Sequence, residues 1–278
     1  MLPQVDFFGY QVTRLLLGDN PFNGHSYIPE VHSGDEMMDY YTAERCVEVL
    51  FAAEEAGINT YVALGEPFVL RIIRQYRNQG GKMNIIFQSY PAIDIDTNLS
   101  MMMKCDPIGI YHQGGTADYF TEMNQTDELI SRLQKIKAAG VPVGLGTHVP
   151  ETVLQSEAEN WGVDFYMTCL YNARRTQRGQ QSGFITGKPK YLVFYPEDRP
   201  LMFDVIQKVQ KPCIAFKIFA GGQAFYNKKP EEIPAVVEDC FRQAYDNIKP
   251  CDMTCIGVFQ KFKDELQEDA DAVRRILG

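Results

Sequence analysis

Short apolar runs alternate along the chain with longer stretches whose apolar residues recur every three or four positions. Runs of the first kind predict strands, and stretches of the second kind predict amphipathic helices. Strand and helix in alternation are typical of a parallel sheet, and eight such runs favour a closed (β/α)8 barrel, a TIM barrel. The predicted strands are Thr13–Leu17, Asn59–Leu64, Asn84–Gln88, Ile108–His112, Val141–Gly146, Asp164–Leu170, Cys213–Phe219 and Met253–Phe259.

The stretches between these runs support the same architecture. Gly57 and Gly140 follow two of them directly, where a helix stop is expected. An open doubly wound sheet is the alternative, but the segment Gly18–Gly24 lacks the Gly-x-Gly-x-x-Gly spacing of a dinucleotide-binding turn. The clearest predicted helices are Ala43–Ala56, Asp127–Ala139, Glu151–Asn160, Leu201–Val209 and Pro234–Asn247.

Length and charge narrow the classes of partner. A chain of 278 residues without a linker or low-complexity tract is expected to form one domain, residues 1–278. A formal net charge of -9 provides no basic field for a phosphate backbone, so we expect no nucleic-acid partner. A small-molecule substrate fits this composition better. The oligomeric state is not indicated.

Cysteine usage and the absence of long apolar runs point to a reducing compartment. The seven cysteines are odd in number and include no Cys-x-x-Cys pair, so we expect reduced thiols. The first residues show no basic and apolar signal pattern, and no apolar run approaches the roughly 18 residues of a membrane span. We therefore expect a cytoplasmic protein with no membrane partner.

Several segments resemble, in chain order, those of the aldo-keto reductase superfamily. The matching segments are Phe8–Gly18, Ala56–Tyr61, Gly144–Thr152, Asp164–Asn172 and Ile214–Gly222. The resemblance implies a TIM barrel whose floor is closed by an N-terminal β-hairpin. It also implies an NAD(P)-linked oxidoreductase with NADP as its cofactor.

The catalytic positions of that family are mostly replaced. Its reductases carry an Asp at the end of strand two, a Tyr soon after, a Lys on strand three and a His on strand four. Here Val62 and Gln88 stand at the Asp and Lys positions, no Tyr follows strand two in its loop, and only His112 matches. A lone His can hydrogen-bond a substrate oxygen, but it does not lower the pKa of a phenol as the family's Lys does. The sequence therefore departs from that of an ordinary carbonyl reductase.

A remnant of the nucleotide site is nevertheless expected. Gly221 and Gly222 would let backbone amides approach a pyrophosphate, and Lys261 and Lys263 would meet the 2′-phosphate of NADP, unless they are merely solvated. Strand alternation puts Lys217 on the face opposite Ile214, from which we expect it to enter the barrel and bind an anion; a Schiff-base lysine and a structural ion pair remain alternatives. The expected cofactor-binding residues are Thr147, His148, Asn172, Lys217, Gly221, Gly222, Lys261 and Lys263.

Polar residues at the carboxyl ends of the strands predict the catalytic site, because barrel enzymes act there. Asp19, Glu66, Gln88 and His112 are the expected catalytic residues, with His112 near Glu66 and Gln88 and orienting a small polar carbonyl or sugar-like substrate. The basic residues of the segment after strand six would form a lid or a solvated surface. They are Arg174, Arg175, Arg178, Lys188 and Lys190.

Two other functions remain open from the sequence. A divalent metal could replace the missing Tyr, although no His-x-His or His-Glu-x-x-His spacing fixes two ligands on one element. The barrel would then be a non-redox lyase, isomerase or hydrolase. A catalytically inactive barrel that binds a metabolite is the third possibility. The metal ligands would be Asp19, His25, Glu66, His112 and His148.

Overall fold

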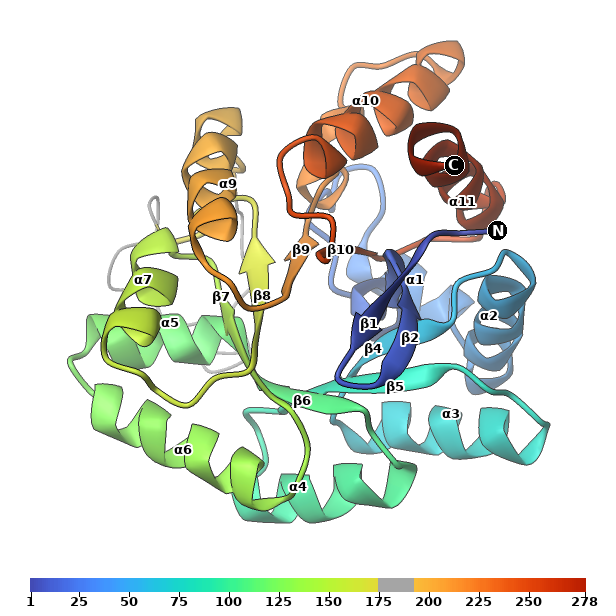
Figure 1. Ribbon diagram of the computed structural model, residues 1–278. Helices are drawn as coiled ribbons and strands as arrows, with labels where there is room; N and C mark the ends of the chain where they lie inside the picture. The colour runs from blue at the N-terminus through green and yellow to red at the C-terminus, as the bar shows by residue number, and fades with distance from the viewer. Residues whose placement is uncertain (175–192) are drawn as a thin grey trace.

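A computed structural model describes residues 1–174 and 193–278 (Figure 1). Parallel strands hydrogen-bond in the order β10-β3-β4-β5-β6-β7-β8-β9 and close into a barrel, so the predicted (β/α)8 fold is confirmed. Each of the eight predicted strand runs overlaps one barrel strand. These strands are β3 (Leu15–Gly18), β4 (Thr60–Leu64), β5 (Asn84–Gln88), β6 (Gly109–His112), β7 (Val143–Thr147), β8 (Phe165–Cys169), β9 (Cys213–Phe216) and β10 (Met253–Ile256).

Helices cover the outside of the barrel. Gly57 follows the end of α2 (Ala43–Glu55) and Gly140 follows the end of α6 (Thr126–Ala138). Their φ values of +86° and +84° are in the left-handed conformation expected of a helix stop. Two additional helices, α1 (Gly34–Tyr40) and α5 (Gly114–Glu122), lie in the connections after β3 and β6. The outer helices are α2 (Ala43–Glu55), α3 (Pro67–Asn78), α4 (Ile95–Met102), α6 (Thr126–Ala138), α7 (Pro150–Ala158), α9 (Arg199–Lys208), α10 (Ile233–Tyr245) and α11 (Glu265–Leu277).

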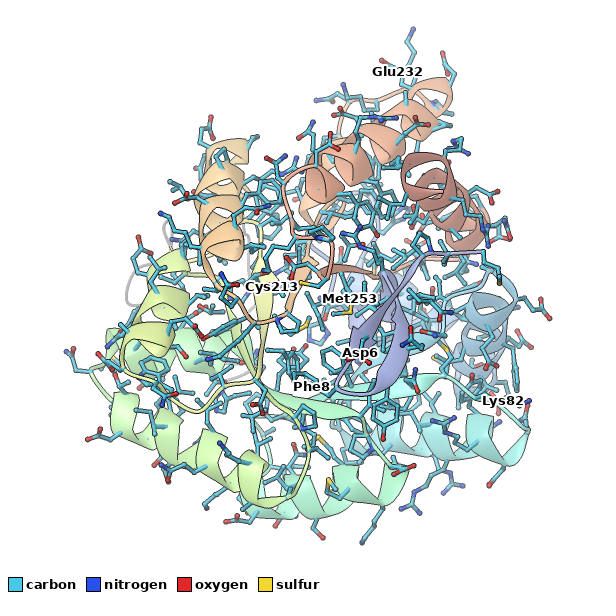
Figure 2. The ribbon with its side chains drawn as sticks, in the orientation of Figure 1. Asp6, Phe8, Lys82, Cys213, Glu232 and Met253 are labelled. Atoms are coloured by element: carbon cyan, nitrogen blue, oxygen red, sulfur yellow. The ribbon has the colours of Figure 1, made fainter. Side chains whose placement is uncertain are left out.

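An N-terminal hairpin of β1 (Gln4–Phe7) and β2 (Tyr10–Thr13) closes one end of the barrel. In Figure 2 the hairpin lies across the end where β9 and β10 begin, at Cys213 and Met253. Phe7 is fully buried and belongs to the same apolar cluster as Met253 of the barrel interior. The predicted hairpin is confirmed, and the amino-terminal floor is closed. Ligands must therefore enter at the carboxyl ends of the strands.

None of the helices in residues 1–174 and 193–278 is long and apolar enough to cross a membrane.

Candidate active site

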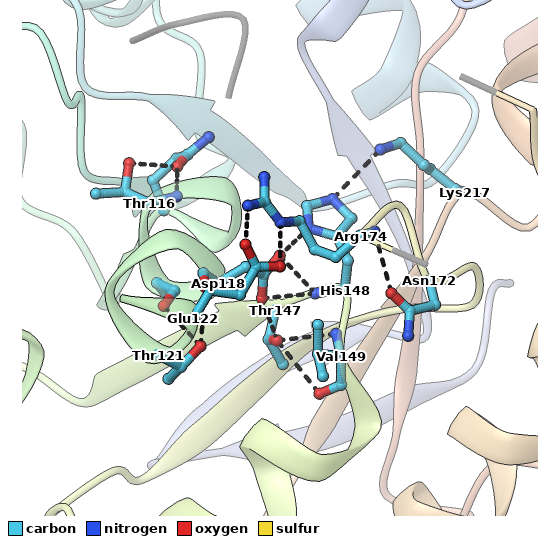
Figure 3. A network of polar contacts seen from close by, with 12 residues as sticks. Thr116, Asp118, Thr121, Glu122, Thr147, His148, Val149, Asn172, Arg174 and Lys217 are labelled. Carbon is cyan, nitrogen blue, oxygen red and sulfur yellow. Dashed lines mark hydrogen bonds and ion pairs between the residues drawn. The ribbon is translucent and has the colours of Figure 1, made fainter. Parts of the chain in front are cut away.

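Three ionisable side chains form a chain of polar contacts at the carboxyl ends of β7 and β9 (Figure 3). Nδ1 of His148 lies 2.7 Å from Oδ2 of Asp118, and Nε2 of the same ring lies 3.5 Å from Nζ of Lys217. Asp118 belongs to α5, His148 follows β7 directly, and Lys217 follows β9. We refer to these residues as the Asp118–His148–Lys217 array.

Gly114 and Gly146 allow α5 to lie close to β7, so that the Asp118 carboxylate reaches His148. A Cβ atom on Gly146 would lie 3.0 Å from the amide nitrogen of Gly114 and from the carbonyl oxygen of His112. Because both neighbours are backbone atoms, only glycine allows α5 to lie this close to the end of β7. The segment after β6 therefore folds back onto β7 and carries Asp118 into the barrel mouth.

Asp118 is anchored by its other contacts as well. Its carboxylate is fully buried and accepts hydrogen bonds from the Thr147 hydroxyl at 2.5 Å and from the His148 backbone N–H at 3.2 Å. A buried carboxylate with several donors holds its neighbours in one arrangement. The imidazole of His148 is thereby oriented toward Lys217.

Lys217 reaches the mouth because β9 ends at Phe216. Its φ of +61° turns the chain out of the strand, a conformation that costs a non-glycine residue free energy. Ile214 belongs to the apolar cluster inside the barrel. The predicted alternation was therefore wrong in placing the face of Ile214 outside, and the turn, not the strand face, directs Lys217 to the mouth.

Aromatic rings surround the ammonium group. Nζ of Lys217 lies 4.4, 5.2 and 5.5 Å from the ring centroids of Tyr27, Phe194 and Phe216. Burial opposes the charge, but the Tyr27 phenol, the Cys169 thiol and Asp118 outweigh burial and raise the pKa of Lys217 above its usual value. Lys217 is therefore an ammonium ion at neutral pH, which argues against a Schiff-base lysine.

The contact with Lys217 favours one tautomer of His148. An ammonium has three donors and no acceptor, so Nε2 of His148 must accept in their contact. The single proton of a neutral ring is then on Nδ1, where it is donated to Asp118. In this tautomer the array presents a basic imidazole nitrogen next to an ammonium at the mouth.

A cavity of about 440 Å³ opens on the other side of the mouth, after β3, β4 and β5. Glu66, the residue that precedes α3, contributes its carboxylate, and burial raises its pKa. His25 also lines the cavity, and burial together with the positive charge of Lys217 lowers its pKa, so the ring is neutral at neutral pH. We call this space the Glu66 cavity. Its lining residues are Phe22, Asn23, His25, Met38, Tyr41, Glu66, Phe68 and Tyr90.

Asp19 lies behind this cavity and does not line it. Its Oδ2 accepts a hydrogen bond from the Leu64 N–H at 2.6 Å and contacts the Tyr61 hydroxyl at 3.4 Å. Burial, with a smaller contribution from the charge of Glu66, raises the pKa of Asp19 to about 7. Two of the expected catalytic carboxyl groups are thus close enough to influence each other.

His112 does not join them. Its side chain is buried on the outer side of β6, with the ring centroid 6.2 Å from that of Phe120 on α5, and burial and Arg132 lower its pKa to about 3. The residue that turns inward is Tyr111, whose hydroxyl donates to Gln88 Oε1 at 2.8 Å. The predicted convergence of His112 with Glu66 and Gln88 was therefore wrong.

Two of the five residues of the metal alternative lie apart from Asp19, His25 and Glu66. His112 lies outside the barrel wall, and His148 is bound to Asp118. Within the part of the chain that the structure describes, no group of three or more His, Cys, Asp or Glu side chains is arranged to hold a metal ion. The metal-dependent reading gains no support from this geometry.

The expected pyrophosphate loop is occupied by the chain itself. A Cβ atom on Gly221 would lie 2.8 Å from Tyr27, and one on Gly222 would lie 2.9 Å from Ile28. The amides of Ala220 and Gly222 donate to carbonyl groups of their own loop. In this arrangement the loop does not fit a nucleotide pyrophosphate, because both its open faces and these donors are used internally.

The remaining expected cofactor residues have protein partners. Lys261 pairs with Glu36 at 2.7 Å, and Lys263 pairs with Glu268. Thr147 supports Asp118, and the backbone N–H of Asn172 donates to Asp198 at 3.0 Å. Binding of a 2′-phosphate by the two lysines remains a prediction.

Of the basic residues expected to form a lid, Arg174 alone is described. It is buried and forms a two-pronged ion pair with Glu122 of α5, with 2.7 Å between Nε and Oε1. Arg175, Arg178, Lys188 and Lys190 lie outside the described residues.

Comparison with known proteins identifies the fold. The sequence matches no protein-family model and no curated protein. A truncated 3-deoxy-D-arabino-heptulosonate 7-phosphate synthase of Thermotoga maritima has a TM-score of 0.56 at 13% identity, covering 99% of this chain and 90% of that one. The chain is a TIM barrel.

Two further similar structures carry different chemistry in their names. A dihydropteroate synthase of Xanthomonas albilineans has a TM-score of 0.55 at 13% identity, with 98% of this chain and 96% of that one covered. A glycerol dehydrogenase of Gluconobacter oxydans, an aldo-keto reductase, has a TM-score of 0.53 at 12% identity, with 99% and 96% covered. At such sequence identities the structural similarity shows only that the fold is a TIM barrel. The chemistry must be inferred from the residues of the site.

Asp118 and the aromatic residues around Lys217 were not predicted as members of the site. Asp118 belongs to a helix in a segment that carried no predicted element, and Tyr27 lies in the long connection after β3. The glycine pair Gly114-Gly115 at the start of α5 was the available signal for a close helix contact. No local spacing could have paired Asp118 with a histidine 30 residues later.

Proposed function

We propose that the protein is an enzyme that moves a proton on the carbon next to the carbonyl group of a small polar or sugar-like substrate. The Asp118–His148–Lys217 array carries this proposal. It combines the two groups that such a reaction needs, a base for the C–H proton and a cation for the oxygen that gains charge. Isomerases, epimerases and carbon–carbon lyases all use this step.

The proton transfer uses both His148 and Lys217. Nε2 of His148 takes the proton from the α-carbon, the C–H electrons form the new C=C bond, and the carbonyl electrons move onto oxygen. The Lys217 ammonium donates a hydrogen bond to that oxygen, in place of the one it makes with His148 in the free protein. In an α-hydroxy carbonyl substrate, delivery of the proton to the former carbonyl carbon completes an isomerisation when the hydroxyl proton moves to the original carbonyl oxygen. Delivery of a proton to the opposite face of the α-carbon completes an epimerisation.

Asp118 and the aromatic rings are positioning residues. The Asp118 carboxylate stabilises the imidazolium that forms when His148 takes a proton. The rings of Tyr27, Phe194 and Phe216 keep water from the Lys217 ammonium and strengthen its interaction with a developing oxyanion.

NADP-linked carbonyl reduction, which the family resemblance implies, stays a prediction without a fitted site. One contact favours it as the second candidate function. The Tyr27 ring lies beside the Lys217 ammonium, so a phenol and a lysine meet here although they are missing from the family's own positions. Titration with NADPH distinguishes carbonyl reduction from proton transfer.

The proposal is tested by exchange of substrate protons with solvent. Small hydroxy-aldehydes and hydroxy-ketones, free and as phosphate esters, are incubated with the protein in D2O, and loss of the α-proton is followed by ¹H NMR. We expect exchange with at least one of these compounds, and a rate lower by about 100-fold or more in His148→Asn and Lys217→Met.

Matched variants elsewhere provide the controls. Lys208→Met and His32→Asn change the same residue types at positions outside the array, and both should exchange at the wild-type rate. Exchange that survives in Lys217→Met, or no exchange with any compound of the panel, would contradict the proposed function.

A further inference from the structure

The Glu66 cavity has aromatic walls and a carboxylate. Rings of Phe22, Tyr41, Phe68 and Tyr90 line it together with Glu66. Aromatic faces carry partial negative charge and attract cations, most strongly where water is excluded. A carboxylate among such rings is the usual composition of a site for an organic cation.

The Glu66 carboxylate has no protein partner within residues 1–174 and 193–278. It occupies the N-cap position of α3 but accepts no hydrogen bond from the first turn of that helix. Burial alone accounts for its raised pKa, and no Lys or Arg contributes. A half-buried carboxylate costs free energy when it is left unpaired, so its position points to a ligand that supplies the donors.

The charge of the surroundings selects the kind of donor. Among the described lining residues Glu66 is the only carboxyl group, and no cationic side chain stands beside it, because the His25 ring is neutral at neutral pH. Asp19 behind the cavity adds negative charge when it ionises. The cavity therefore favours a positively charged donor over a neutral hydroxyl group.

We propose that the Glu66 cavity binds a protonated amine of the substrate, whose carbonyl end lies at Lys217 and His148. His25 lies between the Glu66 cavity and Lys217, since it lines the cavity and the charge of Lys217 lowers its pKa. The substrate class is thus an amino-substituted carbonyl compound, such as an amino sugar. The position of the carbonyl end at Lys217 and His148 rests on the proposed function, whereas amine binding by Glu66 does not.

Benzylamine and benzyl alcohol form a matched pair of probes, equal in size and differing in charge. Their binding is followed by NMR of ¹³C-methyl-labelled methionine, because Met38 lines the cavity and is assigned through Met38→Leu. We expect benzylamine to bind at least about 10-fold more tightly than benzyl alcohol, a preference that a charge-assisted hydrogen bond readily supplies. In Glu66→Gln the ratio should fall to near one, and in Glu55→Gln, on the exposed surface of α2, it should stay unchanged.

Equal binding of the two probes, a preference that persists in Glu66→Gln, or no shift of the Met38 signal at about 10 mM benzylamine would overturn the inference. Thermal unfolding of Glu66→Gln checks that the variant is folded. Lys217→Met should keep the preference for benzylamine while losing proton exchange. Failure of the amine site and failure of the proposed function are therefore distinguishable.

Discussion

Asp19 is a buried carboxyl group with a hydrogen bond from the Leu64 N–H, and burial raises its pKa from 3.8 to about 7. Because the folded protein binds this proton more tightly than the unfolded chain, the free energy of unfolding falls as pH rises from about 4 through 7. Asp19→Asn removes this contribution. We expect the stability of wild type relative to Asp19→Asn to decrease by about 3 kcal/mol between pH 4.5 and 8, measured by urea denaturation.

Other buried carboxyl groups, such as Asp252 and Asp269, also have raised pKa values, but they are present in both proteins and cancel in the difference. A difference in stability that stays constant with pH would show that Asp19 ionises normally.

A substitution of His112 tests whether its side chain lies on the outer side of β6. It is buried between β6 and the outer helices, with Nδ1 unpartnered among the described residues. His112→Ala should lower the free energy of unfolding by about 2–4 kcal/mol, because it leaves a cavity beside Phe120. Proton exchange per folded molecule should stay near the wild-type rate. A stable His112→Ala protein that lacks exchange would restore the mouth position expected from the sequence.

The elements of this fold were easier to predict from sequence than the faces of its strands. The run ending at His112 is a strand as predicted, yet its outward face was taken as the inward one. Strands of a parallel barrel are covered on both faces, so Ile110 and Tyr111 are both buried, on opposite faces, and alternation does not identify the interior. Asp118 was missed because its pairing with His148 depends on tertiary contact between α5 and β7.

The close contact between α5 and β7 depends on Gly146. Gly146→Ala would place a Cβ atom against backbone atoms of His112 and Gly114, so α5 must move away from β7. We expect a loss of about 2 kcal/mol in the free energy of unfolding and a slower proton exchange, because Asp118 moves with its helix. Gly80→Ala adds a Cβ atom with nothing within 4 Å and serves as the control without a clash, in which proton exchange should stay at the wild-type rate. Full exchange in Gly146→Ala would show that Asp118 need not lie under His148.

Nucleotide binding is a prediction about the whole molecule, since it needs loops from several strands at once. In the present arrangement Tyr27 and Ile28 cover Gly221 and Gly222, and Lys261 is paired with Glu36. We expect no saturable binding of NADPH up to about 100 μM in a fluorescence titration, a concentration that corresponds to a binding free energy of about -5.5 kcal/mol. Saturable binding, weakened by Lys261→Ala more for NADPH than for NADH, would instead establish the oxidoreductase function.

The proposed function requires that Nε2 of His148 is a basic nitrogen beside the Lys217 ammonium at the barrel mouth. The most direct measurement is the tautomer of His148, read at pH 7.5 from ¹⁵N-histidine correlation spectra of a protein with four histidines. We expect a proton on Nδ1 of His148 and an unprotonated Nε2, whose ¹⁵N signal shifts in Lys217→Met because the ammonium donor is lost. A proton on Nε2 would contradict the account, because that nitrogen could then neither accept from Lys217 nor remove a proton from a substrate.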